Sequence, residues 1–221
     1  MRYQELFEAP KLSDDPNIVS QHNALSGHYN FEPSQARPLR KLTKDSRDLN
    51  RHLHQQYTRN KIVDIGRTKE LDSVLAAHKA PHSFVVYSGL VVPVKPGIYH
   101  HAGYLHTSLD FNIAKNFVKF IREPEINLVS DCYILRITVP QGSPGAYVGH
   151  MTNQQKAKKL MNTDGSDPTD RNEHEFILPR NTRLKILPNP ETTVQHERAD
   201  LGDDEYDDLY TNWHIFSAEI V

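Results

Sequence analysis

The chain of 221 residues has little of what would mark a disulfide-stabilised or membrane-embedded protein. It contains one cysteine, Cys132, so it can form neither an intramolecular disulfide nor a metal site built from several cysteines. No apolar run approaches the roughly 18 residues of a membrane-spanning helix. The first residues are polar and acidic, unlike a secretory signal. These absences predict a protein of a reducing cytoplasm, or of a particle assembled there, that makes no membrane contact.

The chain also lacks an excess of charge of either sign. Its 26 basic and 28 acidic residues give a formal net charge of -2. Broad association with nucleic acid would need a strongly basic surface. We therefore expect no direct nucleic-acid binding, and charge alone identifies no partner.

Histidine is abundant, with 13 residues, and such a number could suggest a metal site. The histidines are scattered, however, and His100 and His101 form the only adjacent pair. No His-x-x-x-His joins a catalytic glutamate on a recognisable helix. His52 and His54 lie two apart in a helical segment and would face away from each other. We expect no metal site, and surface or capping roles for most of these residues.

Proline and polar residues dominate the first forty positions, where apolar periodicity is weak. This composition predicts an extended N-terminal arm over residues 1–40. In the next segments, 44–57 and 68–78, apolar residues recur at helical spacing. Both are typical of amphipathic helices that pack against a sheet. We therefore divide the rest of the chain, 41–221, into a helical part at 41–80 and a β-rich core at 81–221.

After Pro81 the pattern changes to that of strands, predicted at 83–89, 104–108, 132–139, 176–178, 184–186 and 213–220. A helix is predicted at 110–118 with Asp110 or Ser108 as its N-cap, and a further helix-prone run covers 153–161. The acidic run 191–209 is typical of a solvated loop. Helices followed by strands predict an α+β fold with a mainly antiparallel sheet split into two layers.

Two carboxylates, Glu173 and Glu175, carry the clearest chemical signal. Side chains two apart on a strand point to the same side, so these would lie together at the mouth of the sheet. One of such a pair can stay ionised against a developing positive charge while the other handles a proton. The alternative is that both are solvated at a strand end, which is common for an isolated Glu-x-Glu.

Three segments form a pattern found in a known family: a strand ending in Tyr-Ser-Gly at 87–89, a strand-to-helix junction His-Thr-Ser at 106–108, and Glu-x-Glu at 173–175. In order and spacing they resemble the Arg-Ser-Glu class of mono-ADP-ribosyltransferases. That class has an aromatic-Arg-Gly strand, a Ser-Thr-Ser strand and a Glu/Gln-x-Glu strand. The likeness covers roughly residues 80–220 and implies a split β-sandwich that binds NAD.

Within that class, two stretches look most like the transferases with which tailed phages modify host proteins, RNA polymerase among them. They are Thr-Ser-Leu at 107–109 with the following Asn-Ile helix, and Glu-Phe-Ile-Leu-Pro-Arg-Asn at 175–181. This resemblance implies a protein acceptor in a bacterial host. It also implies a location in the host cytoplasm, with packaging in the virion as a variant.

The resemblance implies a role for each matching residue. Glu175 would bind the 2'-hydroxyl of the nicotinamide ribose and stabilise the oxocarbenium-like centre formed as nicotinamide leaves. Glu173 would orient and deprotonate the acceptor, an arginine by the family pattern. The backbone of Gly89 would hold the nicotinamide amide, and Thr107 and Ser108 would support Glu175.

Aromatic side chains could stack on the nicotinamide, and the candidates are Tyr87, Tyr104 and Phe111. A role in the core is an equal alternative for each of the three. NAD is expected as a substrate, and no metal is expected.

Two positions depart from the family pattern. Ser88 stands where the family has an arginine that grips NAD, and a serine cannot form the bidentate contacts of a guanidinium. Another cation, such as Arg136, Arg180 or a residue of the helical arm, would have to meet the pyrophosphate. His106 stands in place of the first serine of Ser-Thr-Ser and could donate a hydrogen bond to Glu175.

These departures leave two alternatives to protein ADP-ribosylation. An NAD glycohydrolase would use water in place of the protein acceptor. A non-catalytic virion or interaction protein would keep the fold without binding NAD.

Overall fold

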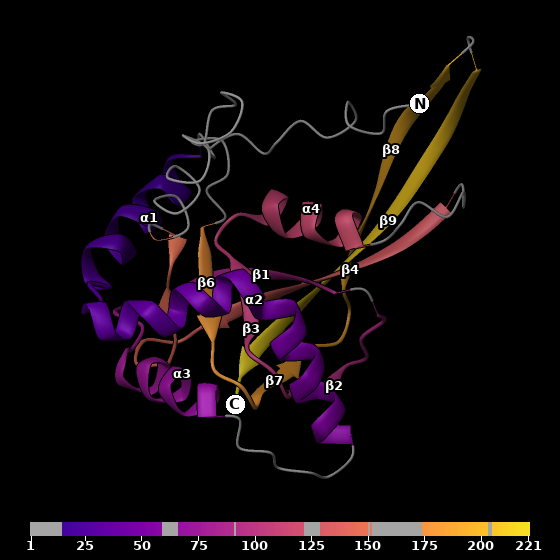
Figure 1. Cartoon of the computed structure of the whole chain (residues 1–221). Coiled ribbons are helices and arrows are strands. Elements are labelled where there is room, and N and C mark those ends of the chain that lie inside the picture. The colour runs from indigo at the N-terminus through magenta and orange to yellow at the C-terminus, as the bar shows by residue number, and fades with distance from the viewer. Residues whose placement is uncertain are drawn as a thin grey trace.

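In a computed structural model, the described part of the chain comprises residues 15–58, 66–90, 92–121, 129–149, 151, 174–202 and 205–221. Three helices come first and a fourth lies between strands (Figure 1): α1 Pro16–His28, α2 Pro33–Thr58, α3 Gly66–Ala77 and α4 Phe111–Ile121. The strands are β1 Phe84–Leu90, β2 Gly97–His101, β3 Leu105–Ser108, β4 Val129–Val139, β5 Ala146–Tyr147, β6 Glu175–Leu178, β7 Thr182–Ile186, β8 Glu191–Gly202 and β9 Glu205–Ile220.

The strands form one hydrogen-bonded sheet in the order β2-β7-β9-β4-β1-β3-β6-β5, and β8 pairs with β9. Among the described pairings, β4 with β9 is parallel and the others are antiparallel. The prediction of an α+β fold with a mainly antiparallel sheet and N-terminal helices is confirmed.

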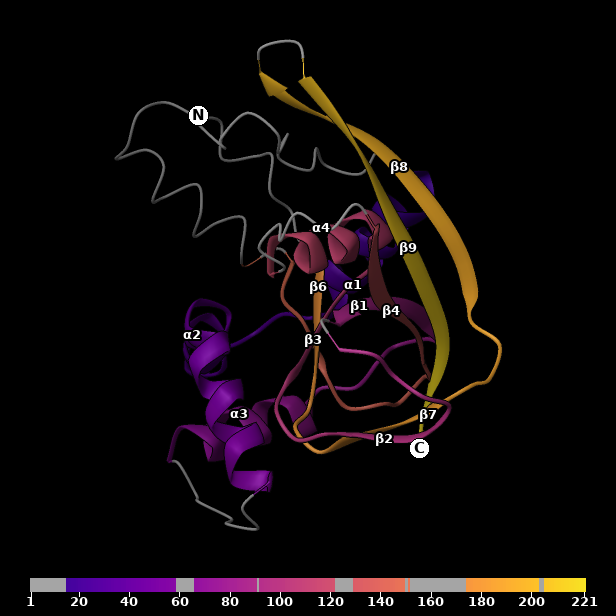
Figure 2. The ribbon, with the colours of Figure 1, turned by 90° about the vertical axis from the view of Figure 1, so that its right-hand side faces the viewer.

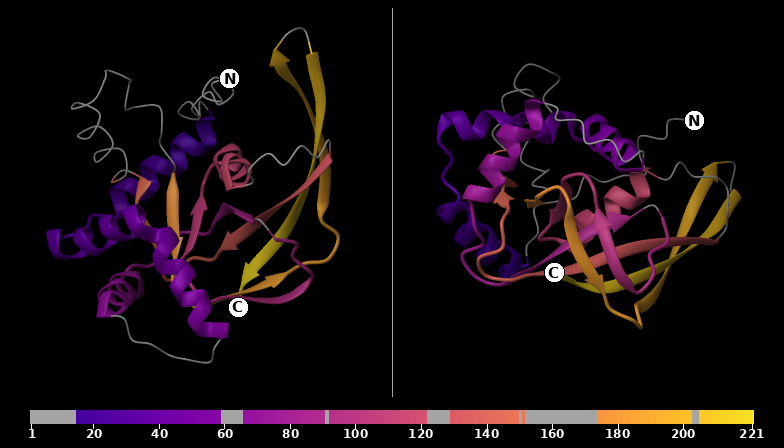
Figure 3. Two further views of the ribbon diagram at one scale, coloured as in Figure 1. Left: turned by 45° about the vertical axis from the view of Figure 1, so that its right-hand side comes forward. Right: turned by 90° about the horizontal axis from the view of Figure 1, so that it is seen from below.

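The sheet curls, so that strands from its two ends share one core (Figure 3). Phe176 of β6 and Leu184 of β7 belong to the same cluster of buried side chains, together with Phe84 of β1 and Phe216 of β9. A second cluster packs α2 and α3 against β5 and β6. A third packs α4 against β4 and β9.

Helix α1 and the start of α2 contradict the predicted extended arm over residues 15–40. The Asp15 carboxylate caps α1 by accepting the N–H of Asn17 at 2.8 Å, and Pro16 occupies its first turn. Proline is compatible with the first turn of a helix, because its missing N–H would be unpaired there. Leu25 is the one residue of α1 that is fully buried, so the helix shows almost no apolar periodicity.

The acidic run was also predicted wrongly. It forms β8 and the beginning of β9, which pair from Glu191 with Ile215 to Gly202 with Glu205. This hairpin projects from the body of the molecule (Figure 2). A two-stranded ribbon surrounded by water can be polar on both faces, so it lacks the alternation by which strands are predicted.

The predicted cap of α4 is confirmed. Asp110 Oδ1 accepts the N–H of Asn112 at 2.8 Å, and the main-chain oxygen of Asp110 accepts the N–H of Ala114. The hydroxyl of Ser108, the other candidate cap, accepts the N–H of Asp110 at 3.0 Å and so holds the capping residue in place.

Some predictions lie outside the described residues. These are the first 14 residues of the arm, the helix-prone run 153–161 and Glu173. No helix of the described residues is both long and apolar enough to span a bilayer.

Candidate active site

The three segments of the sequence pattern lie on neighbouring strands, β1, β3 and β6. Tyr87 pairs with Ser108, and Ser108 pairs with Glu175. Directly paired residues point to the same face of a sheet, so these three side chains form a row across three strands. Strands lie about 4.8 Å apart, which separates the backbones at the two ends of the row by about 10 Å. Glu173 lies outside the described residues, so one member of the predicted carboxylate pair is located.

Glu175 is the most informative member of this row. It is 7% exposed, and its Oε1 lies 2.5 Å from Nδ1 of His106. An ionised carboxylate only accepts hydrogen bonds, so Nδ1 carries the proton and donates it. Within the described structure, Glu175 Oε2 and His106 Nε2 are buried without a hydrogen-bond partner. Unpaired buried polar atoms are rare and costly, and here they indicate a place for a polar ligand.

The hydroxyls of the other two junction residues are used inside the protein. Thr107 Oγ1 donates to the main-chain oxygen of Phe176 at 2.6 Å, which ties β3 to β6. Ser108 starts the turn into α4 through its contact with the N–H of Asp110. Both therefore fix the strand on which His106 lies and the strand that carries Glu175.

Ser88 does not share the face of Glu175. Since Tyr87 pairs with Ser108 and successive side chains alternate, Ser88 points to the opposite side of β1. It is 5% exposed, and its hydroxyl donates to the main-chain oxygen of His106 at 3.0 Å. Ser88 thus joins β1 to β3 instead of contacting a ligand on the Glu175 side.

Gly89 lies on the same face of β1 as Tyr87, where α4 packs closely against the strand. A β-carbon at this position would overlap Cγ2 of Val118 and lie 2.7 Å from the main-chain oxygen of Ala114. Glycine is therefore required here for the approach of α4, whatever else its backbone contacts.

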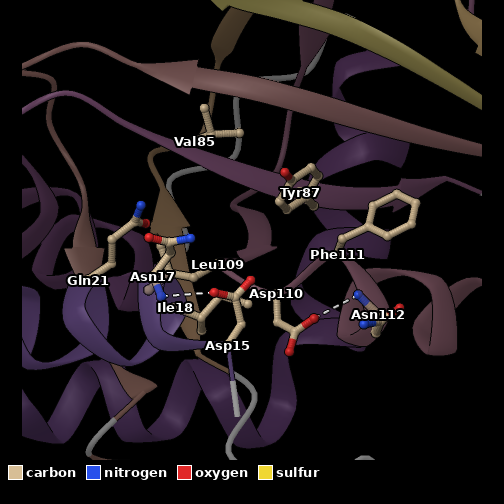
Figure 4. Close-up of a pocket in the computed structure, with 10 residues that line it drawn as sticks. All are labelled: Asp15, Asn17, Ile18, Gln21, Val85, Tyr87, Leu109, Asp110, Phe111 and Asn112. Carbon is tan, nitrogen blue, oxygen red and sulfur yellow. Dashed lines mark hydrogen bonds between the residues drawn. The ribbon is translucent and has the colours of Figure 1, made fainter. Parts of the chain in front are cut away.

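Tyr87 and Phe111 line a cavity of about 260 Å³ between the N-termini of α1 and α4 (Figure 4). Their rings meet edge to face, with centroids 5.4 Å apart. Small-molecule sites usually have volumes of about 300–1,000 Å³, so this cavity can hold only part of a dinucleotide. Burial raises the pKa of Tyr87, Arg136 lowers it, and Asp110 and Asp15 add to the increase.

The two helix N-termini at this cavity would ordinarily attract a phosphate. Each is capped by its own carboxylate, Asp15 in α1 and Asp110 in α4, with N–H to oxygen distances of 2.8 Å (Figure 4). These negative charges make the cavity unfavourable for an anion. A pyrophosphate bound near this cavity would therefore have to meet a cation elsewhere.

Two arginines were candidates for that cation. Arg180 is tied to α3, because its Nε and Nη2 lie 2.8 and 2.7 Å from Asp72 Oδ2. Arg136 pairs with Tyr87 across β1 and β4 and so lies on the same face as the row. Its guanidinium donates to Glu191 at 2.8 Å and to Ser217 at 2.9 Å. Of the two, Arg136 is the one directed to the face of the candidate site.

Sequence reasoning missed a buried polar cluster behind Glu175. Tyr147 Oη lies 2.6 Å from Nδ1 of His22 in α1 and 3.3 Å from Nδ1 of His174. His174 directly precedes Glu175 and has a left-handed backbone with φ of 44°. Burial lowers the pKa of His174 to about 4. The only sequence signal was the position of His174 beside Glu175, since its partners are far apart in the chain.

His101 is the second strongly perturbed histidine near the row. It is 9% exposed, and its Nδ1 donates to the main-chain oxygen of Gly103 at 2.9 Å. Burial lowers its pKa to about 4 and the hydrogen bond opposes that shift, while His54, His106 and His100 lower it further. Among the described residues, no group of three or more His, Cys, Asp or Glu is arranged to hold a metal ion.

Comparison with known proteins gives a family match over most of the chain. A family model described as ADP-ribosyltransferase exoenzyme matches residues 20–207. No curated protein sequence matches the chain.

Several solved structures have the same fold, at sequence identities that establish the fold alone. Plx2a, an ADP-ribosyltransferase toxin from Paenibacillus larvae, is 16% identical with a TM-score of 0.56, over 93% of this chain and 96% of that one. C3stau2 from S. aureus, solved with NAD, is 16% identical with a TM-score of 0.57, over 97% and 99% of the two chains. The Clostridium limosum C3 exoenzyme is 14% identical with a TM-score of 0.54, over 97% and 98%.

Proposed function

The chain belongs to the ADP-ribosyltransferase exoenzyme family, and on that premise we propose that it transfers one ADP-ribose unit from NAD to a side chain of an acceptor protein. Family membership supports an NAD-dependent mono-ADP-ribosyltransferase. The observation that carries the proposal is the buried, unpaired Oε2 of Glu175 in the row across β1, β3 and β6.

In this proposal Glu175 Oε2 accepts a hydrogen bond from the 2'-hydroxyl of the nicotinamide ribose. The bond between the ribose C1' and nicotinamide breaks, and its electron pair leaves with nicotinamide. The sugar then becomes cationic, and a fixed carboxylate beside it lowers the barrier because the charge develops only in the transition state. His106 holds the other carboxylate oxygen, so the side chain is oriented before NAD binds.

We further propose an arginine as the acceptor. Glu173 would remove a proton from the guanidinium as its nitrogen bonds to C1', so that the proton passes to the carboxylate and the ribosylated guanidinium keeps a single positive charge. The support is the Glu-x-Glu pattern of Glu173 and Glu175 in the sequence, which resembles the third motif of the family.

The acceptor protein is proposed to be one of a bacterial host, such as RNA polymerase, met in the host cytoplasm after synthesis there or release from a virion. The support is the likeness of residues 107–109 and 175–181 to the transferases of tailed phages. Labelling lysates with radioactive NAD tests this proposal. A labelled bacterial band, identified by mass spectrometry, supports it, and labelling confined to a eukaryotic lysate contradicts it.

The reaction type is tested by the same labelling with two variants. Glu175→Gln should abolish protein labelling. Glu219→Gln, which makes the same chemical change at an exposed position of β9, should leave it unchanged. Free ADP-ribose without protein labelling would indicate NAD hydrolysis instead of transfer.

One observation favours a non-catalytic alternative. Ser88 stands where the family has an arginine, and it is buried on the side of β1 that faces away from Glu175. A chain without a cation for the pyrophosphate would bind NAD poorly. Calorimetric titration with NAD decides the matter: saturable binding removes this alternative, and its absence at millimolar NAD supports it.

A further inference from the structure

The contact between His106 and Glu175 places a titratable ring against the carboxylate on which the proposed reaction depends. Nδ1 lies 2.5 Å from Oε1, and the side chains are 25% and 10% exposed. The pair is therefore largely removed from water, where charges interact more strongly than at the surface. A serine at this position could hold the carboxylate by the same kind of hydrogen bond, but it could not change its charge.

We propose that His106 is a positioning residue for Glu175 and that its charge makes the reaction pH-dependent. With a neutral ring, the Nδ1–H orients Glu175 and leaves the carboxylate its full negative charge. With a protonated ring, the same contact becomes an ion pair that neutralises Glu175. The neutral form is the active one. This inference rests on the proposed function, since it assumes that Glu175 stabilises a cationic sugar.

The geometry defines the tautomer on which this inference depends. Because the carboxylate accepts, the proton of the neutral ring resides on Nδ1, and Nε2 is then a bare acceptor. Nε2 is buried and has no hydrogen-bond partner among the described residues. Protonation would place a new N–H and a positive charge at this atom, where no described group receives them. Among the described residues, the ring thus has a hydrogen-bond partner on its Glu175 side alone.

Described titratable groups on β6 and β2 act on this ring. Glu175 reaches it from β6, and His101 on β2 lies within electrostatic range, with His100 and His54 next to His101. His101 is buried and carries no charge above about pH 5, because burial lowers its pKa to about 4. Histidine is the side chain that ordinarily changes charge between about pH 5 and 8, so substitution of His106 tests whether this ring causes a change of activity in that interval.

The experiment measures kcat/KM for nicotinamide release between pH 5 and 9 in the full chain and in three variants. His106→Ser introduces the family residue, His106→Asn keeps a donor N–H near the Nδ1 position without a titrating ring, and Glu175→Gln removes the carboxylate. The kcat/KM of the wild type should fall at least tenfold between pH 8 and pH 5. His106→Ser or His106→Asn should have a kcat/KM at pH 8 within about tenfold of the wild-type value. Toward pH 5, the kcat/KM of these variants should fall much less than that of the wild type.

Two results would overturn the inference. One is an unchanged acidic decrease in both His106 variants, which would assign it to another group. The other is the loss of activity at every pH in variants that fold and bind NAD, which would make the histidine itself indispensable to the chemistry. If the wild type binds NAD but releases no nicotinamide at any pH, the proposed function fails and this inference fails with it. If the wild type is active and its pH profile does not change when His106 is substituted, this inference alone is overturned.

Discussion

Acid should destabilise this fold strongly, because two histidines are buried in their neutral form. His174 and His101 are 1% and 9% exposed, and burial lowers the pKa of each to about 4 from the ordinary value of 6.5. The unfolded chain therefore binds these protons more readily than the folded one. Their contribution to stability is complete above pH 6.5 and is lost as the pH falls from 6.5 toward 4.

The magnitude follows from the two pKa values of each histidine. Between pH 7.5 and pH 5, a group that titrates at 6.5 when unfolded and at about 4 when folded removes about 2 kcal/mol from the free energy of unfolding. The two histidines together remove about 4 kcal/mol, a large share of the 5–15 kcal/mol typical of a domain. Urea unfolding followed by circular dichroism at a series of pH values measures the loss.

A substitution isolates the contribution of one histidine. His174→Asn removes the titrating ring and keeps a residue that tolerates the left-handed backbone at this position. The variant should be less stable at pH 7.5, yet its stability should fall by about 2 kcal/mol less than that of the wild type on acidification. His196→Asn, at an exposed position of β8, serves as the control. The reasoning is refuted if His174→Asn keeps the pH dependence of the wild type.

Three further substitutions test other parts of the structure. Gly89→Ala should destabilise the fold by about 1–3 kcal/mol, because the new β-carbon meets α4. Gly27→Ala should not destabilise it, because nothing lies within 4 Å of the β-carbon added there. The midpoints of urea unfolding compare the two variants. Tyr104→Phe should lower the free energy of unfolding by about 1–2 kcal/mol in the same assay, because the buried Tyr104 hydroxyl lies 2.9 Å from a carboxylate oxygen of α3. An unchanged midpoint would contradict this role of the hydroxyl. If Arg136 meets the pyrophosphate, Arg136→Ala should weaken NAD binding by about tenfold in calorimetry. Arg183, at an exposed position of β7, is the control, and equal weakening by Arg183→Ala would contradict this role of Arg136.

The elements that sequence predicted well are those with periodic apolar residues and a recognisable cap. Leu184 and Ile186 alternate inward on β7 as expected, and Asp110 caps α4. The order of the three motifs also predicted that Glu175 would lie beside His106, because each motif belongs to a strand of the same sheet.

Other features depend on contacts that sequence patterns do not encode. Helix α1 buries one residue fully, Leu25, so its position comes from capping and tertiary packing instead of periodicity. On β8, residues 191–194 and 196 are all exposed, so no buried face imposes alternation there. The direction of Ser88 follows from the pairing of Tyr87 with Ser108, which no motif specifies.

The most direct test of the account compares Glu175→Gln with Glu219→Gln in two measurements on NAD, the Kd from calorimetry and kcat for nicotinamide release. If Glu175 acts on the transition state, its substitution should lower kcat by about 10²–10³ while the Kd changes by less than about threefold. The Glu219 variant should match the wild type in both. A Glu175→Gln variant that releases nicotinamide at the wild-type rate would contradict the central claim.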